Sequence, residues 1–375
     1  WVLWTALSGM INRRESRMTK KINKVRLPSI SAEQIQLLER LSNASGVSGN
    51  EGEVRKIVLE AVSPHADEIK VDALGNVLAS RHSANSGALR VMLAAHMDEV
   101  GLMVTAEDGD GLYRFEAVGG LEAWKLPGKT VWVGKDKLPA VVGLKPIHLA
   151  ERDELQRPVT LDGLRLDLGP GAKVKVGEWA VFATSFAQVG PSLRGKALDD
   201  RIGVATLIEL FKQAPPEINL QAAFTVQEEN GLRGAKVAAY AFNPDLAIAL
   251  DCTPAYDLPL WDGSENTRYN TRLGAGPAVY VADAATLSHP ALVRHLLATA
   301  EAEGIPCQIR QPGGGGTDAG AIHKQRAGIP SVSVSVPGRY LHRPASLVRL
   351  SDWENSLKLV YAALMRLTPE ILQGA

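Results

Sequence analysis

Apolar residues recur along this chain at two spacings, and the alternation between these spacings predicts the fold class. Helical spacing follows Ser31 and Gln34, a pair typical of a capping box, and returns near residues 54–58, 202–210, 235–240, 290–300 and 353–367. Strand-like apolar runs lie between these segments at residues 69–71, 77–79, 91–95, 222–226, 246–250 and 331–336. We therefore predict an α/β fold with a mixed sheet and helices on both of its faces.

Residues 102–189 break this alternation. They are rich in glycine and valine, are interrupted by turn pairs such as Gly119-Gly120 and Pro127-Gly128, and lack helical spacing. We predict a small β-rich domain over 102–189, inserted between two parts of a catalytic domain, residues 26–101 and 190–375. We expect this inserted domain to bury little apolar surface of its own and to expose three tryptophans, a residue type enriched at interfaces: Trp124, Trp132 and Trp179.

The first 25 residues read differently from the rest. An apolar run from Trp1 to Leu7 precedes Arg13 and Arg14, the reverse of the order in a signal peptide, and it is far shorter than the roughly 20 residues of a membrane span. We expect residues 1–25 to be a leader outside the fold. We find no other apolar run that is a candidate membrane span.

The charge balance and the cysteine content of the chain exclude some classes of protein and of metal site. Lys and Arg total 41 and Asp and Glu total 41, so the chain lacks the basic excess expected of a nucleic-acid binder. The two cysteines, Cys252 and Cys307, cannot form a disulfide framework and indicate a reducing cytosol. Because neither cysteine belongs to a metal-binding pair, any metal here is expected to have nitrogen and oxygen ligands.

Potential metal ligands follow apolar runs at five separate points of the sequence. They are His96 with Asp98, Asp199, Glu228 with Glu229, Asp251, and His342. Each alone has a structural explanation, since a single histidine is more often structural, an acidic pair is usually solvated, and an aspartate can cap a helix. In an open α/β sheet, however, the carboxyl ends of strands converge on one crevice. A pair of divalent ions sharing one carboxylate, with another carboxylate free as a base, uses the whole set.

Asp98 is expected to orient His96 rather than to bind metal. Residues two apart on an extended segment share a face, so a carboxylate there can accept a hydrogen bond from the imidazole nitrogen that faces away from the metal. Such a bond fixes the tautomer of the histidine and raises its basicity.

The motifs at these points carry a family resemblance. In order, Ala-His-Met-Asp-Glu-Val-Gly, Leu-Asp-Asp-Arg, Gln-Glu-Glu-x-Gly-Leu-Arg-Gly-Ala, Leu-Asp-x-Thr-Pro-Ala, Gly-Gly-Thr-Asp-Ala-Gly-x-Ile-His and Arg-Tyr-x-His resemble the M42 family of metallo-aminopeptidases over about residues 30–368. The resemblance implies five metal ligands, two on each ion and one shared: His96 and Asp251, Glu229 and His342, and the bridging Asp199. It also implies that Glu228 is the general base. Arg343, where relatives usually have a small residue, leaves the substrate preference open.

The expected function is removal of N-terminal residues from peptides by a two-metal site, with zinc, cobalt or manganese as the ions. The resemblance further implies that the inserted domain is PDZ-like and mediates dimers, which associate into a hollow dodecamer. Two alternatives remain: a metal-dependent deacylase or carboxypeptidase-like hydrolase, and an inactive binding scaffold, although no ligand or base is missing. A glycosidase needs a carboxylate pair but no histidines, so it leaves His96 and His342 unexplained.

Overall fold

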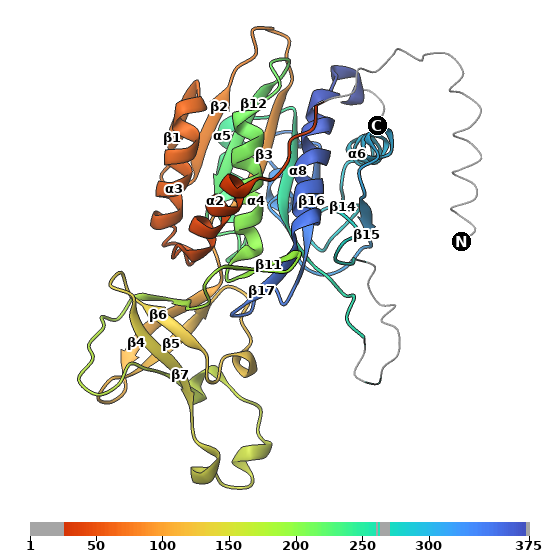
Figure 1. Cartoon of the computed structure of the whole chain (residues 1–375). Helices are drawn as coiled ribbons and strands as arrows, with labels where there is room; N and C mark the ends of the chain where they lie inside the picture. The colour runs from red at the N-terminus through yellow and green to blue at the C-terminus, as the bar shows by residue number, and fades with distance from the viewer. Residues whose placement is uncertain (1–25, 260–261, 263–270, 373–375) are drawn as a thin grey trace.

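The protein consists of a large sheet covered by helices and a smaller barrel beside it (Figure 1). The structure is a computed structural model that describes residues 26–259, 262 and 271–372. The predicted leader, residues 1–25, lies outside the described residues.

Eleven strands form the large sheet, and its centre is parallel. β12, β3, β13 and β16 run parallel to one another, whereas the strands that flank this group, β2 on one side and β14 and β17 on the other, pair with it antiparallel. The carboxyl ends of β3, β12 and β13 therefore meet at one edge. Along the sheet the order is β1 (Glu68–Val71), β2 (Val77–Arg81), β12 (Asn219–Thr225), β3 (Arg90–His96), β13 (Leu246–Pro254), β16 (Ser331–Arg339), β17 (Ser346–Arg349), β11 (Ser192–Gly195) and β10 (Ala187–Val189), with β14 (Ala278–Tyr280) beside β16 and β15 (Gln308–Arg310) beside β14.

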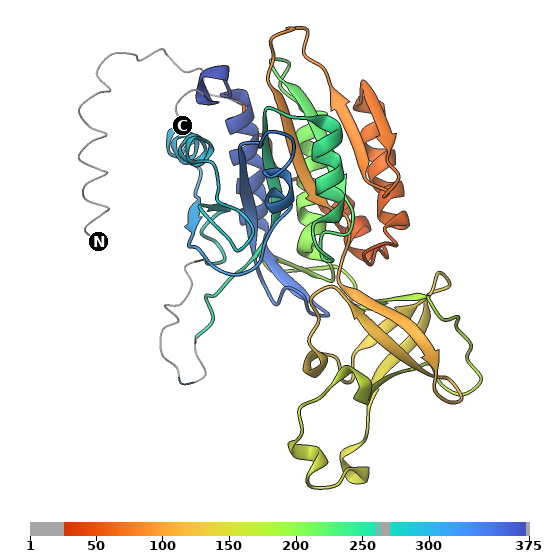
Figure 2. The ribbon, with the colours of Figure 1, turned by 180° about the vertical axis from the view of Figure 1, so that it is seen from behind.

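Helices cover both faces of this sheet, as predicted (Figures 1 and 2). On one face lie α2 (Ala32–Asn43), α3 (Gly52–Val62), α4 (Leu198–Lys212), α6 (Pro290–Glu303) and α8 (Leu350–Met365), and on the other lie α5 (Arg233–Phe242) and α7 (Ala319–Ile322). β3 supplies both cores, because Val91 and Leu93 pack into the first and Met92 and Ala94 into the second. None of the helices in the described part of the chain has the length and apolar character needed to cross a membrane.

The barrel closes in the order β4–β5–β8–β7–β6–β9. Its strands are β4 (Gly101–Glu107), β5 (Leu112–Val118), β6 (Thr130–Val133), β7 (Leu138–Leu144), β8 (Leu164–Asp167) and β9 (Trp179–Phe182). The expectation of little buried apolar surface is wrong, because closure turns one face of every strand inward and buries Tyr113, Phe115 and Leu166 in a separate core. Of the tryptophans, Trp124 and Trp132 are 60% and 37% exposed, whereas Trp179 is half-buried.

Six one-turn 3-10 helices complete the described secondary structure: η1 (Ser63–His65), η2 (Ala123–Lys125), η3 (Ile147–Leu149), η4 (Glu154–Gln156), η5 (Leu161–Gly163) and η6 (Pro369–Leu372).

A buried ion network joins the loop after β3 to the beginning of α4. The Glu99 carboxylate accepts hydrogen bonds from Lys196 Nζ at 2.7 Å, from Arg201 Nη2 at 3.0 Å and from the backbone N–H of Gly46 at 3.1 Å. Arg201 also donates from Nε to the carbonyl of Met97 at 2.8 Å. Burial penalises the ammonium and lowers the pKa of Lys196 to about 8. Glu99 is thus the only anion that the two cations contact among the described residues.

Replacing Glu99 with glutamine should destabilise the fold strongly. The change leaves two buried cations without a counter-charge, and breaking a buried pair in this way costs about 3–5 kcal/mol. Chemical denaturation followed by circular dichroism measures the free energy of unfolding. The matched control is Glu60→Gln, which removes an exposed ion pair with Arg40 and should cost less than about 1 kcal/mol. Equal losses in the two variants would contradict the role given to Glu99.

Candidate metal centre

The structure brings all the predicted ligands to one edge of the sheet. Each lies near the carboxyl end of a strand or at the start of a helix: His96 ends β3, Glu228 and Glu229 follow β12, Asp251 lies in the second half of β13, Asp199 is at the start of α4, and His342 follows β16. The backbone at Asp199 is not helical, although it lies within the bounds of α4. Its side chain faces His96 and His342.

Asp199 lies between the two histidines. Its Oδ1 is 3.4 Å from Nε2 of His96, and its Oδ2 is 3.6 Å from Nε2 of His342. Nε2 of His342 is also 3.2 Å from Oε2 of Glu229, and Nε2 of His96 is 3.8 Å from Oδ1 of Asp251. Each histidine therefore has its own carboxylate, and Asp199 offers one oxygen to each side.

Glu228 points into the same space from the loop after β12. Its Oε2 lies 3.9 Å from Nε2 of His96. In the described part of the chain no lysine or arginine forms an ion pair with Glu228, Glu229, Asp199 or Asp251.

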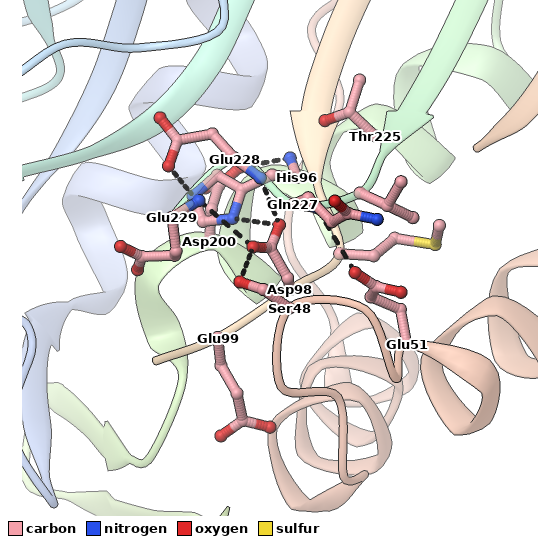
Figure 3. Close-up of polar contacts among 12 residues, drawn as sticks. Ser48, Glu51, His96, Asp98, Glu99, Asp200, Thr225, Gln227, Glu228 and Glu229 are labelled. Carbon is pink, nitrogen blue, oxygen red and sulfur yellow. Dashed lines mark hydrogen bonds and ion pairs between the residues drawn. The ribbon is translucent and has the colours of Figure 1, made fainter. Parts of the chain in front are cut away.

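The loop that carries Glu228 and Glu229 is held by Asp98 (Figure 3). The buried Asp98 carboxylate accepts the backbone N–H of Glu228 at 3.0 Å, that of Glu229 at 3.1 Å and the Ser48 hydroxyl at 2.5 Å. Oδ1 of Asp98 is also 3.4 Å from Nδ1 of His96, a buried nitrogen that has no hydrogen-bond partner among the described residues. Burial opposes the charged form of Asp98, but His96 and these donors outweigh it and lower its pKa.

The electrostatics of the cluster show an excess of negative charge. Burial raises the pKa of Glu228 and Glu229, with further increases from neighbouring carboxylates, and raises the pKa of Asp251 to about 7. Burial disfavours the imidazolium of His96, yet the surrounding carboxylates outweigh burial and raise its pKa. Nitrogen and oxygen ligand atoms of His96, Asp199 and Glu229 lie within 4.8 Å of one another. This donor set fits divalent cations, which would supply the missing positive charge.

Asp200 belongs to the site and was not among the predicted site residues. It is fully buried, and its Oδ2 accepts the backbone N–H of His96 at 3.2 Å while Oδ1 accepts that of Gly203 at 3.0 Å. Burial raises its pKa well above the usual range. The doubled acid Asp199-Asp200 was the signal in the sequence, but which of the two faces the ligands depends on the backbone.

Backbone strain collects around the site. Ala197, Gln227 and His342 have φ values of 52°, 54° and 51°, in the left-handed region that residues with a Cβ rarely adopt. His342 is a candidate ligand, Ala197 lies two residues before the candidate ligand Asp199, and Gln227 directly precedes Glu228. Strain of this kind persists only where surrounding contacts hold it, and it is typical of functional sites.

The barrel supplies one wall of the centre, through the turn that follows β5. The carbonyl of Gly120 lies 3.2 Å from Nδ1 of His342, a distance that suits a hydrogen bond donated by the imidazole. A Cβ on Gly120 would lie only 2.8 Å from that nitrogen, and a Cβ on Gly119 would lie 3.3 Å from Cβ of Glu229. No local pattern in the sequence indicates this contact, because the two residues are 222 positions apart.

The ligand cluster opens into a cavity of about 990 Å³. Its lining comes from the barrel turn, the ends of the strands and the glycine loop: Gly119, Gly120, Leu121, Glu122, Lys125, Leu232, Cys252, Pro254, Tyr256, Tyr280, Ala284, Ala285, Arg310, Gly314, Gly315, Gly316 and Leu341, together with the candidate ligands and Glu228.

Known proteins resemble this chain over almost its whole length. Residues 75–359 match the model of the family described as M42 glutamyl aminopeptidase. The lysyl aminopeptidase of Pyrococcus furiosus is 33% identical over 348 residues, which cover 89% of this chain and 97% of that protein. Among solved structures, an aminopeptidase from the archaeon Desulfurococcus kamchatkensis is 34% identical with a TM-score of 0.85, covering 91% of this chain and 97% of that one.

A further solved structure concerns assembly. The TET1 peptidase of Pyrococcus horikoshii, described as able to assemble into a tetrahedron or a large octahedral shell, is 33% identical with a TM-score of 0.78. The match covers 89% of this chain and 100% of that one.

Substituting alanine for Gly120 should disturb the His342 side of the centre. The added methyl group would meet Nδ1 of His342 at 2.8 Å, so the imidazole must move. We expect purified Gly120→Ala to bind fewer divalent ions than wild type, by metal analysis after dialysis, with little change in the free energy of unfolding. Gly143→Ala is the matched control, because its added Cβ would meet nothing closer than 3.7 Å. Full metal content in Gly120→Ala would contradict the contact.

Proposed function

Because this chain belongs to the M42 glutamyl aminopeptidase family, we propose that it removes N-terminal residues from peptides with two bound divalent cations and Glu228 as general base. The observation that carries the proposal is the position of Asp199, which offers one carboxylate oxygen to each histidine. On this proposal His96 and Asp251 hold one cation, Glu229 and His342 hold the other, and Asp199 bridges them. Zinc is the proposed ion, with cobalt and manganese as alternatives.

Two cations bound here would polarise the scissile carbonyl and lower the pKa of the attacking water toward neutrality. Glu228 would accept the proton of that water and deliver it to the leaving amine. A supporting observation is the hydrogen bond from its backbone N–H to Asp98, which holds the loop that carries this carboxylate. The carboxylate cluster would also attract the free α-amino group of a peptide, which favours cleavage at the N-terminus.

The division of roles predicts different defects in two acid-to-amide variants. Glu228→Gln removes only the proposed base, so it should keep its metal and lose roughly 10²–10⁴-fold in kcat. Asp199→Asn removes the proposed bridge and should lose metal as well. Metal analysis and hydrolysis of leucine p-nitroanilide measure both quantities. Chelated wild type should be inactive and recover with zinc, cobalt or manganese.

Three results would count against these assignments. Equal metal loss in both variants would remove the distinction between base and bridge. Full activity of the chelated enzyme would exclude the metal-dependent reaction. Cleavage of N-acetyl-leucine p-nitroanilide as fast as the free amine would favour a deacylase or an endopeptidase over an aminopeptidase.

We also propose that the inserted β-rich segment, residues 102–189, is a PDZ-like dimerisation domain and that dimers assemble into a dodecamer. The exposure of Trp124 and Trp132 supports an interface on this part of the chain, because large aromatic residues are enriched at interfaces. The shells of the Pyrococcus horikoshii TET1 peptidase, 33% identical to this chain, support the larger assembly.

Light scattering at working concentration tests the proposed assembly. We expect a mass near twelve times that of the 40.2 kDa chain, because another solved TET1 structure, 32% identical to this chain with a TM-score of 0.78, is described as a dodecamer. A mass near two chains would leave only the dimer, and a mass near one chain would contradict both.

A further inference from the structure

A cation without a carboxylate partner stands in the wall of the cavity. Arg310, the last residue of β15, is half-buried and lines the cavity, and it forms no ion pair with any described residue. The other lysine or arginine in the lining, Lys125, is paired with Glu122. Among the lysines and arginines of the described cavity wall, Arg310 is therefore the one without a carboxylate in direct contact.

Neutral groups hold the Arg310 side chain in place. Nε donates to Oγ1 of Thr253 at 3.1 Å, and Nη2 donates to the carbonyl of Gly314 at 2.8 Å. The guanidinium carbon also lies 4.5 Å from the centre of the Tyr280 ring, a cation–π contact. These contacts orient the guanidinium before any ligand arrives, but none of them neutralises its charge.

The same contacts place Arg310 beside the metal centre. Thr253 is two residues after the candidate ligand Asp251 on β13, so their side chains share one face of the strand. Tyr280 and the Gly314–Gly316 loop line the cavity together with Asp251. If the scissile bond of a substrate lies at the ligand cluster, a side chain or terminal group next to that bond can therefore contact Arg310.

The guanidinium group of Arg310 is best suited to bind a carboxylate. It has five N–H donors in a planar fork that matches the two oxygens of a carboxylate. On Arg310 the Nη1 contacts, to the carbonyls of Ala282 and Gln311, are both 3.4 Å long and leave those donors weakly used. A carboxylate at this point would provide both the missing charge and better acceptors.

We propose that Arg310 is a specificity-determining residue that binds the side-chain carboxylate of a substrate's first residue, so that the enzyme prefers N-terminal glutamate or aspartate. This inference rests on the proposed aminopeptidase function. Family membership does not decide it, because the family description says glutamyl while the relative from Pyrococcus furiosus is named lysyl.

The test compares glutamyl and glutaminyl p-nitroanilides, which differ by one charge and almost nothing in shape. We expect wild type to prefer the glutamyl substrate, and Arg310→Gln to lower kcat/KM for it by about 10- to 100-fold, the range for a hydrogen-bonded charge contact. The glutaminyl and leucyl substrates should change less than about threefold. Arg310→Glu should shift the preference to the lysyl substrate.

Arg326→Gln is the matched control. Arg326 also stacks on a tyrosine, Tyr240, at 3.6 Å, but it does not line the cavity, so its loss should leave the glutamyl-to-glutaminyl ratio unchanged. Metal content and circular dichroism equal to wild type would show that Arg310→Gln is folded. A misfolded Arg310→Gln would be replaced by Arg310→Lys, which keeps the charge but not the fork and should lower the ratio by a smaller factor.

The possible failures can be told apart. An equal loss on all anilides in Arg310→Gln, or a wild type without preference for the glutamyl substrate, would overturn the role of Arg310. A short peptide also has a C-terminal carboxylate, so Leu-Leu and Leu-Leu-amide are compared. A loss confined to Leu-Leu would assign Arg310 to that carboxylate and overturn the side-chain assignment. A wild type that cleaves none of the substrates with any metal would overturn the aminopeptidase proposal and this inference with it.

Discussion

The burial of several carboxylates at one point is the constraint on which the rest of this structure depends. Asp199, Glu229 and Asp251 are brought together where parallel strands end, and the described lysines and arginines do not pair with them. Negative charges gathered away from water are stable only if they are protonated or if cations join them. The two histidines among them are ligands suited to such cations. Because this fold holds several carboxylates close together, binding of cations would lower the free energy of the folded state.

Two adjacent acids connect this cluster to the scaffold. Asp98 faces the site and accepts backbone hydrogen bonds from Glu228 and Glu229, whereas Glu99 points away from it (Figure 3). The Glu99 carboxylate accepts hydrogen bonds from Lys196 and Arg201. One dipeptide thus fixes the loop with the proposed base on one side and the beginning of α4 on the other. The loop that carries the proposed base is therefore anchored to the core through this dipeptide.

The features that were predicted correctly from the sequence are those that a local pattern of residues determines. The capping box at Ser31 is present, and the convergence of ligands follows from parallel strands, whose ends meet whatever the loops do. Strands β14 and β15 have three residues each, too few for alternation to appear. The closure of the barrel, the contact of Gly120 with His342, and the choice between Asp199 and Asp200 are products of tertiary structure. Arg310 was missed for the same reason, since its significance comes from the neutral partners around it.

The barrel begins at Gly101, five positions after His96, and its turn at Gly120 reaches back to His342. The inserted segment therefore cannot be replaced by another domain without affecting the candidate metal centre. A substitution that moves the Gly120 turn of the barrel would also move the backbone carbonyl that contacts His342 in the candidate metal centre. A protein engineer who replaced the barrel would therefore also have to rebuild the wall of the candidate metal centre beside His342.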